Sequence, residues 1–267
     1  MSTAGAAPAG HEALSPVRIV RFRVMTYNIH RCIGVDRRFR PERIVAIINH
    51  HDPDLVLLQE VDEGAPRSRE LNLARELAEA AGYPHFALGH NVSLRKGWYG
   101  NATLSRFPVR RERNIDLTIG RRKRRGCQHT TLLLPPDLQG GERRLELFNL
   151  HLGLSARERE QQAGVLLRCD ELADLPPEQP CIVGGDFNDW RSLLRPLFTQ
   201  ALGFRNATDL KSRNGVIRTY PSFSPRGGLD RVYYRGGLRL IHVRTSRLQL
   251  CRVASDHLPV VLDFELS

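Results

Sequence analysis

The sequence predicts an α/β fold in which two β-sheets pack against each other and helices cover them on the outside, within one domain. The N-terminal part alternates strand-like and helix-like segments, and roughly ten short strand-like segments occur along the chain. There is neither an internal repeat nor a linker long enough to divide the chain. A chain of 267 residues can bury a sizeable core as one domain.

The N-terminal third predicts the order β-α-β-α. The segment "IVRFRVMTYNI" (19–29) alternates apolar and polar residues like a strand, and "DLVLLQEV" (54–61) reads as a short buried strand. Between them, Pro41 suits the first turn of a helix over 41–50. A second helix is predicted over 68–81, because apolar residues recur on one face and a glycine follows.

The remaining elements are expected to be mostly strands. Ser155 and Glu158 have the spacing of a capping box, which predicts a helix that continues to about Ala173. Another helix is expected to reach about Leu202, with Pro196 breaking or kinking it. Strands are predicted over 100–109, 129–135, 144–153, 180–187, 215–223, 229–234, 237–246 and 258–266.

Composition favours anionic partners. The chain has 40 Lys and Arg against 29 Asp and Glu, a formal net charge of +11, which suits nucleic acid, an acidic membrane surface or phosphorylated small molecules. Five cysteines without a Cys-x-x-Cys pair indicate reduced thiols and argue against a disulfide framework or a zinc site. Residues 1–17 resemble a disordered tail and not a secretory signal, so one catalytic domain is expected over 18–267. Since no apolar run approaches ~18–20 residues, we expect a cytoplasmic protein.

Polar residues gather where the predicted strands begin or end. They are Asn28, Glu60, His151, Asp186, Asn188, Asp230, Asp256 and His257. Such a set is rich in oxygen and lacks thiolates, so it suits Mg²⁺ or Mn²⁺ and supplies imidazoles for proton transfer. Each residue alone also has a structural reading as a turn cap, an exposed strand end or a core histidine. Asp189 suits a helix N-cap and is left out of the site.

The order of the motifs resembles a known superfamily. The motifs "TYNIH", "LQEVD", "GNATLSRFP", "NLHLG", "GGDFND", "LDRVYY" and "SDHLPV", between residues 24 and 260, closely resemble the endonuclease/exonuclease/phosphatase superfamily of deoxyribonuclease-I-like phosphoesterases. The resemblance implies a four-layer α/β sandwich, with two packed mixed sheets flanked by helices. It also implies Mg²⁺-dependent (or Mn²⁺-dependent) hydrolysis of a phosphoester. The flanking residues resemble a bacterial branch of uncharacterised metal-dependent hydrolases and lipid- or sphingomyelin-cleaving relatives.

The resemblance also implies a metal site and substrate contacts. Glu60 is the expected principal metal ligand, Asn28 contacts metal or phosphate beside it, and Asp256 serves the metal side. Asn101, in the "GNATLSRFP" motif, is expected to bind substrate.

The same resemblance implies the catalytic residues. Asp186 and Asn188 would orient or deprotonate the attacking water and hold a phosphate oxygen. Asp230 would hydrogen-bond His257 and set its tautomer, while His257 contacts the phosphate or acts as acid or base. His151 would stabilise the transition state or protonate the leaving oxygen.

The substrate is left more open by the sequence. Nine basic residues between Arg106 and Arg125, against two acidic ones, hold +7 of the net charge, and the run Arg121–Arg125 could track a phosphate backbone, sit on anionic lipid or be a solvated loop. Arg67 and Arg69 could reach a substrate phosphate or simply lie on the surface. The expected substrate is a polyanionic phosphodiester such as DNA or RNA. The alternatives are a phospholipid or sphingomyelin headgroup, a small phosphomonoester, or a non-catalytic binding module on the same fold. No obligate protein partner is implied.

Overall fold

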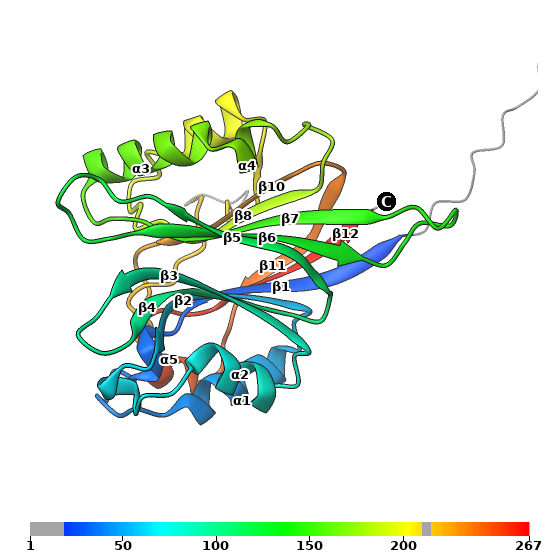
Figure 1. The fold of residues 1–267 in the computed structure, drawn as a ribbon. Coiled ribbons are helices and arrows are strands. Elements are labelled where there is room, and N and C mark those ends of the chain that lie inside the picture. The colour runs from blue at the N-terminus through cyan, green and yellow to red at the C-terminus, as the bar shows by residue number, and fades with distance from the viewer. Residues whose placement is uncertain (1–18, 210–214, 267) are drawn as a thin grey trace, which may run out of the picture.

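Two six-stranded mixed sheets form the centre of the molecule, and helices cover the outer face of each (Figure 1). The computed structural model describes residues 19–209 and 215–266, so the tail expected over 1–17 lies outside the described residues. The predicted four-layer α/β sandwich is confirmed.

The first sheet has the strand order β11-β12-β1-β2-β4-β3. Its strands are β1 (Val20–Asn28), β2 (Leu55–Glu63), β3 (His85–Ser93), β4 (Trp98–Ser105), β11 (Leu238–Thr245) and β12 (Val260–Leu266). β1 and β2 are parallel, and β12 runs antiparallel to β1. The carboxyl ends of β1 and β2 therefore lie beside the start of β12, at the edge on the left in Figure 1.

The second sheet repeats this pattern with the order β5-β6-β7-β8-β10-β9. Its strands are β5 (Val109–Asp116), β6 (Gly126–Leu134), β7 (Arg143–His151), β8 (Cys181–Asp186), β9 (Arg205–Asn206) and β10 (Asp230–Arg235). β7 and β8 are its parallel pair, and β10 begins beside the end of β8. Each sheet thus brings two strand ends and one strand start to the same edge.

Helices flank the sheets as the apolar periodicity predicts. α1 (Pro41–His51), α2 (Leu73–Ala80) and the short α5 (Cys251–Ala254) lie on the first sheet, and α3 (Ala156–Arg168) and α4 (Asp170–Ala173) lie on the second (Figure 1). The predicted cap of α3 is confirmed, since the Ser155 hydroxyl accepts a hydrogen bond from the Glu158 N–H at 3.2 Å. α2 begins later than predicted because a 3-10 turn, η2 (Pro66–Ser68), precedes it and Asn72 caps it.

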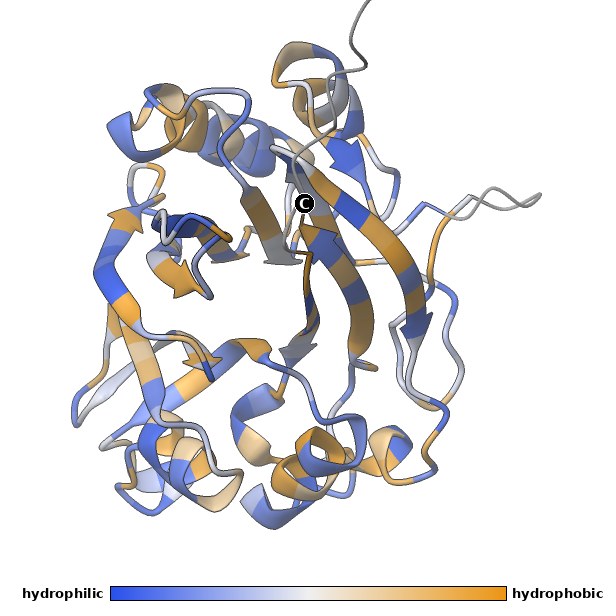
Figure 2. Cartoon of the chain, turned by 90° about the vertical axis from the view of Figure 1, so that its right-hand side faces the viewer, coloured by the Kyte–Doolittle hydropathy of each residue, from blue (hydrophilic) through white to orange (hydrophobic). Residues whose placement is uncertain are grey.

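The main core lies between the two sheets. Leu57 of the first sheet and Leu147 and Val232 of the second are fully buried there. Apolar and polar residues alternate along the strands, as Figure 2 shows. Removal of these side chains from water is the main term that holds the sheets together and fixes their edges relative to each other.

Two predicted elements are wrong. The helix expected up to Leu202 is mostly a loop, with only a π-helical turn η3 (Leu197–Ala201). Asp189 is not a helix N-cap there; its carboxylate accepts from the Leu194 N–H at 2.8 Å and closes a turn. The segment 215–223 is not a strand, because its N–H groups bond to three different segments: Ile217 to Thr208, Thr219 to Gly227, and Ser222 to Asp256.

Candidate active site

The first sheet contributes oxygen-bearing side chains to the site edge. Asn28 is the last residue of β1, Glu60 lies near the end of β2, and Asp256 comes four residues before β12. The pairing of Asn28 with Gln59 places the first two side by side. The Ser255 hydroxyl, donating to the Asn28 carbonyl at 2.7 Å, ties the Asp256 segment to the end of β1.

The second sheet contributes the groups that can move protons. Asp186 ends β8 and pairs in register with His151 at the end of β7 and with Asp230 at the start of β10. All three are at least 96% buried, with exposed fractions of 1%, 4% and 0%. His257, also buried, follows Asp256 and completes this group.

One carboxylate oxygen joins the two halves of the site. Asn28 Nδ2 donates to Asp186 Oδ2 at 3.0 Å. The Nε2 atoms of His151 and His257 lie 3.5 and 3.7 Å from the same oxygen. Three nitrogen groups therefore surround Asp186 Oδ2, and a reacting phosphate oxygen or water would meet both donors and a base there.

His257 is held by a carboxylate on its other side. His257 Nδ1 lies 2.9 Å from Asp230 Oδ2, which also accepts a hydrogen bond from the Thr219 hydroxyl. Burial lowers the pKa of His257, but the carboxylates of Asp230 and Asp186 more than offset it and raise the pKa to about 10. His257 therefore carries a proton at neutral pH, so Nε2 is a donor.

The other two titratable groups are shifted mainly by burial. Burial raises the pKa of Asp186 to about 6, although the His257 charge opposes it. Burial also lowers the pKa of His151 well below its usual value, with the Arg125 charge adding to the effect. The site thus holds one protonated and one neutral imidazole beside a carboxyl that titrates near neutrality, the separation of pKa values that acid–base chemistry uses.

Glu60 occupies an unusual backbone position. The pairing of β2 with β4 shifts at Gln59/Val61, and Glu60 sits in this bulge with φ of 61°, a left-handed conformation. Such positions store strain and re-aim side chains at functional sites. The Glu60 carboxylate accepts no hydrogen bond within the described part of the chain, and its nearest cation is Arg31 Nε at 3.6 Å.

The occurrence of glycine directly before Asp186 has a steric explanation. Gly185 has φ of 136°, and a Cβ there would lie 2.0 Å from the Leu150 carbonyl oxygen on β7. Only glycine allows β8 to approach β7 this closely, so the double glycine positions Asp186 against His151.

The structure places the other predicted site residues in different surroundings. Asn188 is buried at the site, where its N–H donates to Asp186 Oδ1 at 2.9 Å and its amide to the Leu152 carbonyl. Asn101 is buried as well, and its amide nitrogen donates to two main-chain carbonyls. Arg67 forms a two-point ion pair with Asp62, and Arg69 stacks over the Phe39 ring. These arginines are thus engaged by their own neighbours.

Sequence reasoning missed several groups at the site. Arg125 is only 5% exposed, and within the described residues its guanidinium forms no ion pair and its Nε no hydrogen bond. The basic run signalled this residue but not its burial, which comes from the turn before β6. Tyr220, whose ring centroid lies 5.0 Å from that of His257, lies within the segment 215–223 that was predicted to be a strand.

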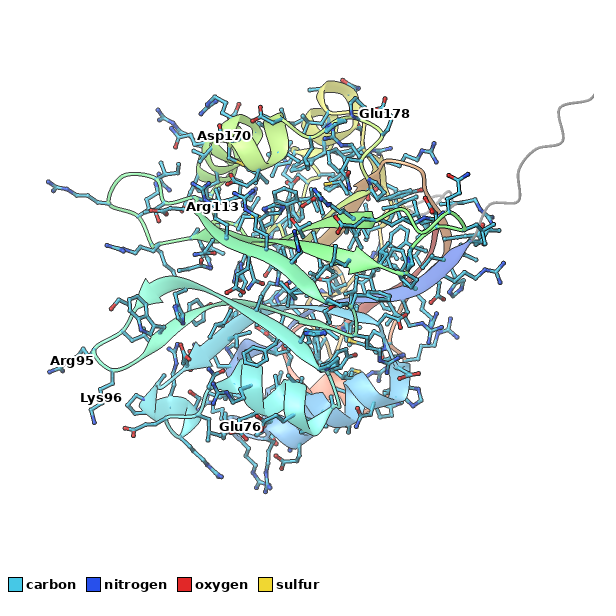
Figure 3. The ribbon with its side chains drawn as sticks, turned by 45° about the vertical axis from the view of Figure 1, so that its right-hand side comes forward. Glu76, Arg95, Lys96, Arg113, Asp170 and Glu178 are labelled. Atoms are coloured by element: carbon cyan, nitrogen blue, oxygen red, sulfur yellow. The ribbon has the colours of Figure 1, made fainter. Side chains whose placement is uncertain are left out.

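Further positive charge lines the site edge. The four residues from Arg121 to Arg124 are exposed in the β5–β6 loop, and Lys123 lies over the Tyr99 ring with Nζ 5.2 Å from its centroid. Arg95 and Lys96 project from the β3–β4 loop on the same side (Figure 3). The edge therefore favours an anionic ligand.

A divalent cation fits the donors that the first sheet supplies. The uncommitted carboxylate of Glu60, with Asn28 and Asp256 at the same edge, offers hard oxygen ligands. Asp186, Asp230 and His257 form the one group of three in the described residues whose potential ligand atoms all lie within 4.8 Å of one another. Within this group, His257 Nδ1 is already engaged by Asp230 Oδ2 at 2.9 Å, which leaves Nε2 facing Asp186.

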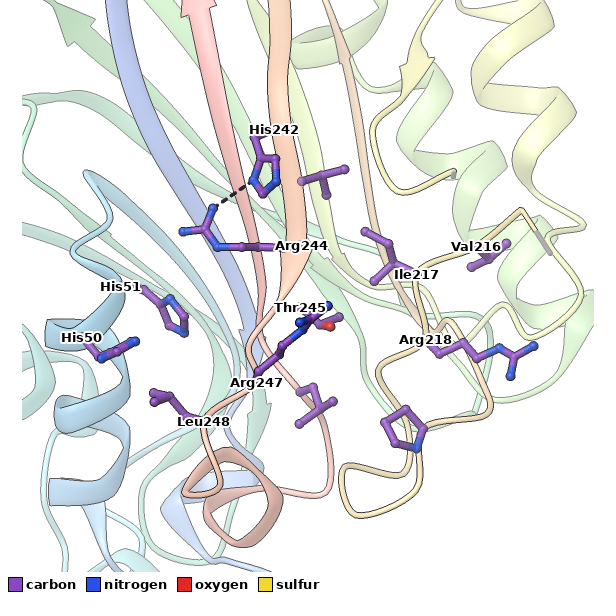
Figure 4. A pocket seen from close by; sticks show the side chains of 13 residues that line it. His50, His51, Val216, Ile217, Arg218, His242, Arg244, Thr245, Arg247 and Leu248 are labelled. Carbon is purple, nitrogen blue, oxygen red and sulfur yellow. Dashed lines mark hydrogen bonds between the residues drawn. The ribbon is translucent and has the colours of Figure 1, made fainter. Parts of the chain in front are cut away.

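A large cavity lies away from these residues. It measures about 1070 Å³ and lies between the end of α1, β11 and the loop around Ile217 (Figure 4). Three arginines, three histidines and apolar side chains line it, and none of the site residues described above does. This cavity is therefore separate from the buried Asp186 cluster.

Fold and site together define a phosphoesterase-type α/β sandwich. A family model described as the endonuclease/exonuclease/phosphatase family matches residues 25–257, and the chain belongs to this family. It is 30% identical over 254 residues to the "Uncharacterized protein YbhP" of Escherichia coli K12, covering 92% of this chain and 96% of YbhP.

Solved structures share the fold. An endonuclease/exonuclease/phosphatase from Beutenbergia cavernae has a TM-score of 0.74 at 22% identity, with 92% of this chain and 72% of that chain covered. ANGEL2, a 2',3'-cyclic phosphatase, has a TM-score of 0.69 at 18% identity, with 96% and 99% covered. A humanized D. rerio TDP2 has a TM-score of 0.68 at 16% identity, with 91% and 98% covered.

None of the helices in the described residues is both long and apolar enough to cross a membrane.

Proposed function

We propose that this protein is a divalent-metal-dependent hydrolase of phosphodiesters. The observation that carries the proposal is the convergence of Asn28, His151 and His257 on Asp186 Oδ2 at the edge between the sheets. Family membership supports hydrolysis of a phosphoester, and the metal and the substrate are inferred from the side chains.

Glu60, Asn28 and Asp256 would hold Mg²⁺ or Mn²⁺. A bound ion of this kind supplies neutralising charge to a phosphate oxygen. In the strained bulge, the Glu60 carboxylate accepts no hydrogen bond within the described residues, and the Arg31 ion pair at 3.6 Å is the contact that a metal ion would replace. Asp186, with a pKa near 6, orients and deprotonates the attacking water, and Asn188, whose main-chain N–H donates to Asp186 Oδ1, would hold a phosphate oxygen with its side chain.

The two histidines serve the phosphate and the leaving group. Asp230 holds His257 through Nδ1, so Nε2–H points into the site and donates to a phosphate oxygen as negative charge builds on it. His151 lies on the other side of Asp186 and stabilises the leaving oxygen. Positioned acid–base groups of this kind contribute roughly 10²–10⁴-fold to a rate.

The substrate carries negative charge in addition to that of the scissile phosphate. Buried Arg125 has no ion-pair partner among the described residues, and a buried unpaired charge is unfavourable unless a ligand compensates it. Nucleic acid is the first candidate, because the Arg121–Arg124 loop continues the positive edge and the fold is shared with ANGEL2 and TDP2. A phospholipid headgroup is the second candidate, favoured by the exposed apolar side chains of Leu154, Trp190 and Phe223 near the same strand ends.

Hydrolysis of bis(p-nitrophenyl) phosphate with Mg²⁺ tests the chemistry, and nicking of supercoiled plasmid tests the first substrate. We expect Mg²⁺-dependent activity that falls together in His257→Ala and Asp186→Asn. Glu63→Gln is the matched control, since Glu63 hydrogen-bonds Asn72 and His90 outside the cluster. Activity retained in both site variants, or hydrolysis of p-nitrophenyl phosphate alone, would contradict the proposal. Diester hydrolysis without nicking would remove nucleic acid as the substrate.

A further inference from the structure

Exposed apolar side chains concentrate on the active-site edge. Ten large apolar residues are exposed in the described part of the chain, and only Ile19, Leu138 and Ile241 lie away from this edge. The other seven follow or precede the site-bearing strand ends: Val35, Trp98, Leu154, Trp190, Leu193, Phe223 and Val253. Leu154, Phe223 and Trp190 are 77%, 64% and 54% exposed. Exposed apolar groups are ordinary singly, but their gathering around a polar site indicates a contact surface.

Several of these side chains are fixed next to the site. Trp190 packs on Tyr220 with ring centroids 5.6 Å apart, and Tyr220 lies against His257. The Ser222 N–H donates to the Asp256 carbonyl at 2.8 Å, which holds neighbouring Phe223 at the site. The fold therefore holds Trp190 and Phe223 in exposed positions beside the site.

Each of four apolar residues has an exposed arginine close by in the chain. The pairs are Leu154 with Arg157, Trp190 with Arg191, Phe223 with Arg226, and Val253 with Arg252. Within the described residues none of these guanidinium groups forms an ion pair or a hydrogen bond. Apolar side chains flanked by unpaired arginines are typical of surfaces that bind an anionic bilayer. The apolar side chains enter the boundary with the acyl chains, and the arginines contact the lipid phosphates.

We propose that these four apolar–arginine pairs form a docking surface for an anionic lipid bilayer. A single-stranded nucleic acid would use aromatic rings and arginines, but Leu154 and Val253 have no ring on which a base could stack. The presence of both aliphatic and aromatic side chains therefore favours a lipid bilayer over a single-stranded nucleic acid. Docking of this surface would bring the Asp186 cluster to the headgroup level.

The docking surface bears on which substrate the proposed phosphodiesterase hydrolyses. It rests on that function only for its consequence, which is that a lipid headgroup, the second candidate substrate, is favoured over nucleic acid. Binding to a bilayer is independent of turnover and can be measured without it, so the two proposals fail separately.

Co-sedimentation with vesicles tests the docking surface. We expect the full chain to bind phosphatidylglycerol vesicles and to bind phosphatidylcholine vesicles at least tenfold more weakly. Leu154→Ser/Val253→Ser and Trp190→Ala/Phe223→Ala should each reduce binding to phosphatidylglycerol at least fivefold. Leu138→Ser/Ile241→Ser removes equally exposed apolar groups away from the site and should leave binding unchanged. Hydrolysis of bis(p-nitrophenyl) phosphate without lipid should be unchanged in the Leu154/Val253 and Leu138/Ile241 variants. Circular dichroism checks the fold of the Trp190/Phe223 variant, because Trp190 packs on Tyr220 beside His257.

Three results would overturn the proposal. The wild type could fail to bind phosphatidylglycerol vesicles, or the Leu138/Ile241 variant could lose as much binding as the other two. Alternatively, only the aromatic variant could lose vesicle binding while single-stranded DNA competes with the vesicles, which would assign the surface to nucleic acid.

Discussion

At the scale of single residues, Asp230 is the partner on which His257 depends. It is fully buried, and Asp230 Oδ2 accepts from both His257 and Thr219. We predict that Asp230→Asn lowers kcat on bis(p-nitrophenyl) phosphate by about 10²–10⁴-fold, because the protonated imidazole loses its counter-charge and orientation. The pH–rate profile should also change, because the pKa of His257 falls when the Asp230 charge is removed. An unchanged pH profile with lower kcat would show that Asp230 is only structural.

Replacement of Arg125 should lower activity without lowering the free energy of unfolding. Since its buried guanidinium has no ion-pair partner in the described residues, we predict that Arg125→Met leaves the free energy of unfolding unchanged or raises it by about 1 kcal/mol. Its kcat/KM should fall by about 10²-fold or more, as when one charged donor to a transition state is removed. Urea unfolding and steady-state kinetics measure the two effects. Exposed Arg124→Met is the control and should change kcat/KM by less than threefold.

Residue types at strand ends were readable from the sequence, but their contacts were not. Asp186 and His257 were predicted as parts of one site because their motifs follow a family order, and the structure brings them together. The burial of Arg125 and the approach of Tyr220 to His257 were not readable, since both depend on how irregular segments fold back. Arg67 and Arg69 are attractive as basic residues near a motif, yet local partners engage both.

At the scale of elements, the β7–β8 pair positions the acid–base residues. We predict that Gly185→Ala destabilises the protein by about 2 kcal/mol or more, because the new Cβ would meet the backbone of Leu150 at 2.0 Å and φ is positive. Gly184→Ala is the matched neighbour; its Cβ would meet the flexible end of Leu57 at 2.8 Å and should cost less. Urea unfolding of both variants gives the comparison. Equal destabilisation would contradict the account of the close strand approach.

The last turn of α1 should make stability depend on pH. His51 is 7% exposed with Nε2 2.8 Å from the Ser246 hydroxyl, and burial lowers its pKa to about 4 from 6.5. A depressed histidine pKa means that the unfolded chain binds the proton more readily, so stability is complete above pH 6.5 and falls as the pH drops towards 4. The loss is at most about 3 kcal/mol. His51→Gln should flatten this part of the stability–pH curve, whereas exposed His50→Gln should not; parallel curves for wild type and His51→Gln would refute the assignment.

Elements with a clear period were predictable, and irregular ones were not. The alternation of β1, the apolar run of β2 and the Ser155 cap of α3 each express one local rule. The segment 215–223 alternates as a strand does, but its N–H groups bond to three separate segments, which no local pattern reveals. The turn closed by Asp189 likewise depends on a side-chain contact that competes with helix formation.

At the scale of the whole molecule, the two sheets divide the chemistry. The first brings oxygen ligands and His257 to the shared edge, the second brings His151 and a shifted carboxyl, and the Asn28–Asp186 hydrogen bond joins them. The packed core between the sheets fixes this juxtaposition. Family membership made the sandwich predictable, while the exposed apolar–arginine pairs could be related to one another only once loops from four parts of the chain lay at one edge.

The central claim is that this edge is a divalent-metal centre for phosphodiester hydrolysis. Titration of Mn²⁺ followed by electron paramagnetic resonance, on wild type and on Glu60→Gln, tests it most directly. Glu63→Gln on the same strand is the control. We predict that wild type and Glu63→Gln bind Mn²⁺ alike, and that Glu60→Gln binds it at least tenfold more weakly, because the free carboxylate in the bulge is lost. Equal Mn²⁺ affinity in wild type and Glu60→Gln, or no binding by the wild type, would contradict the claim.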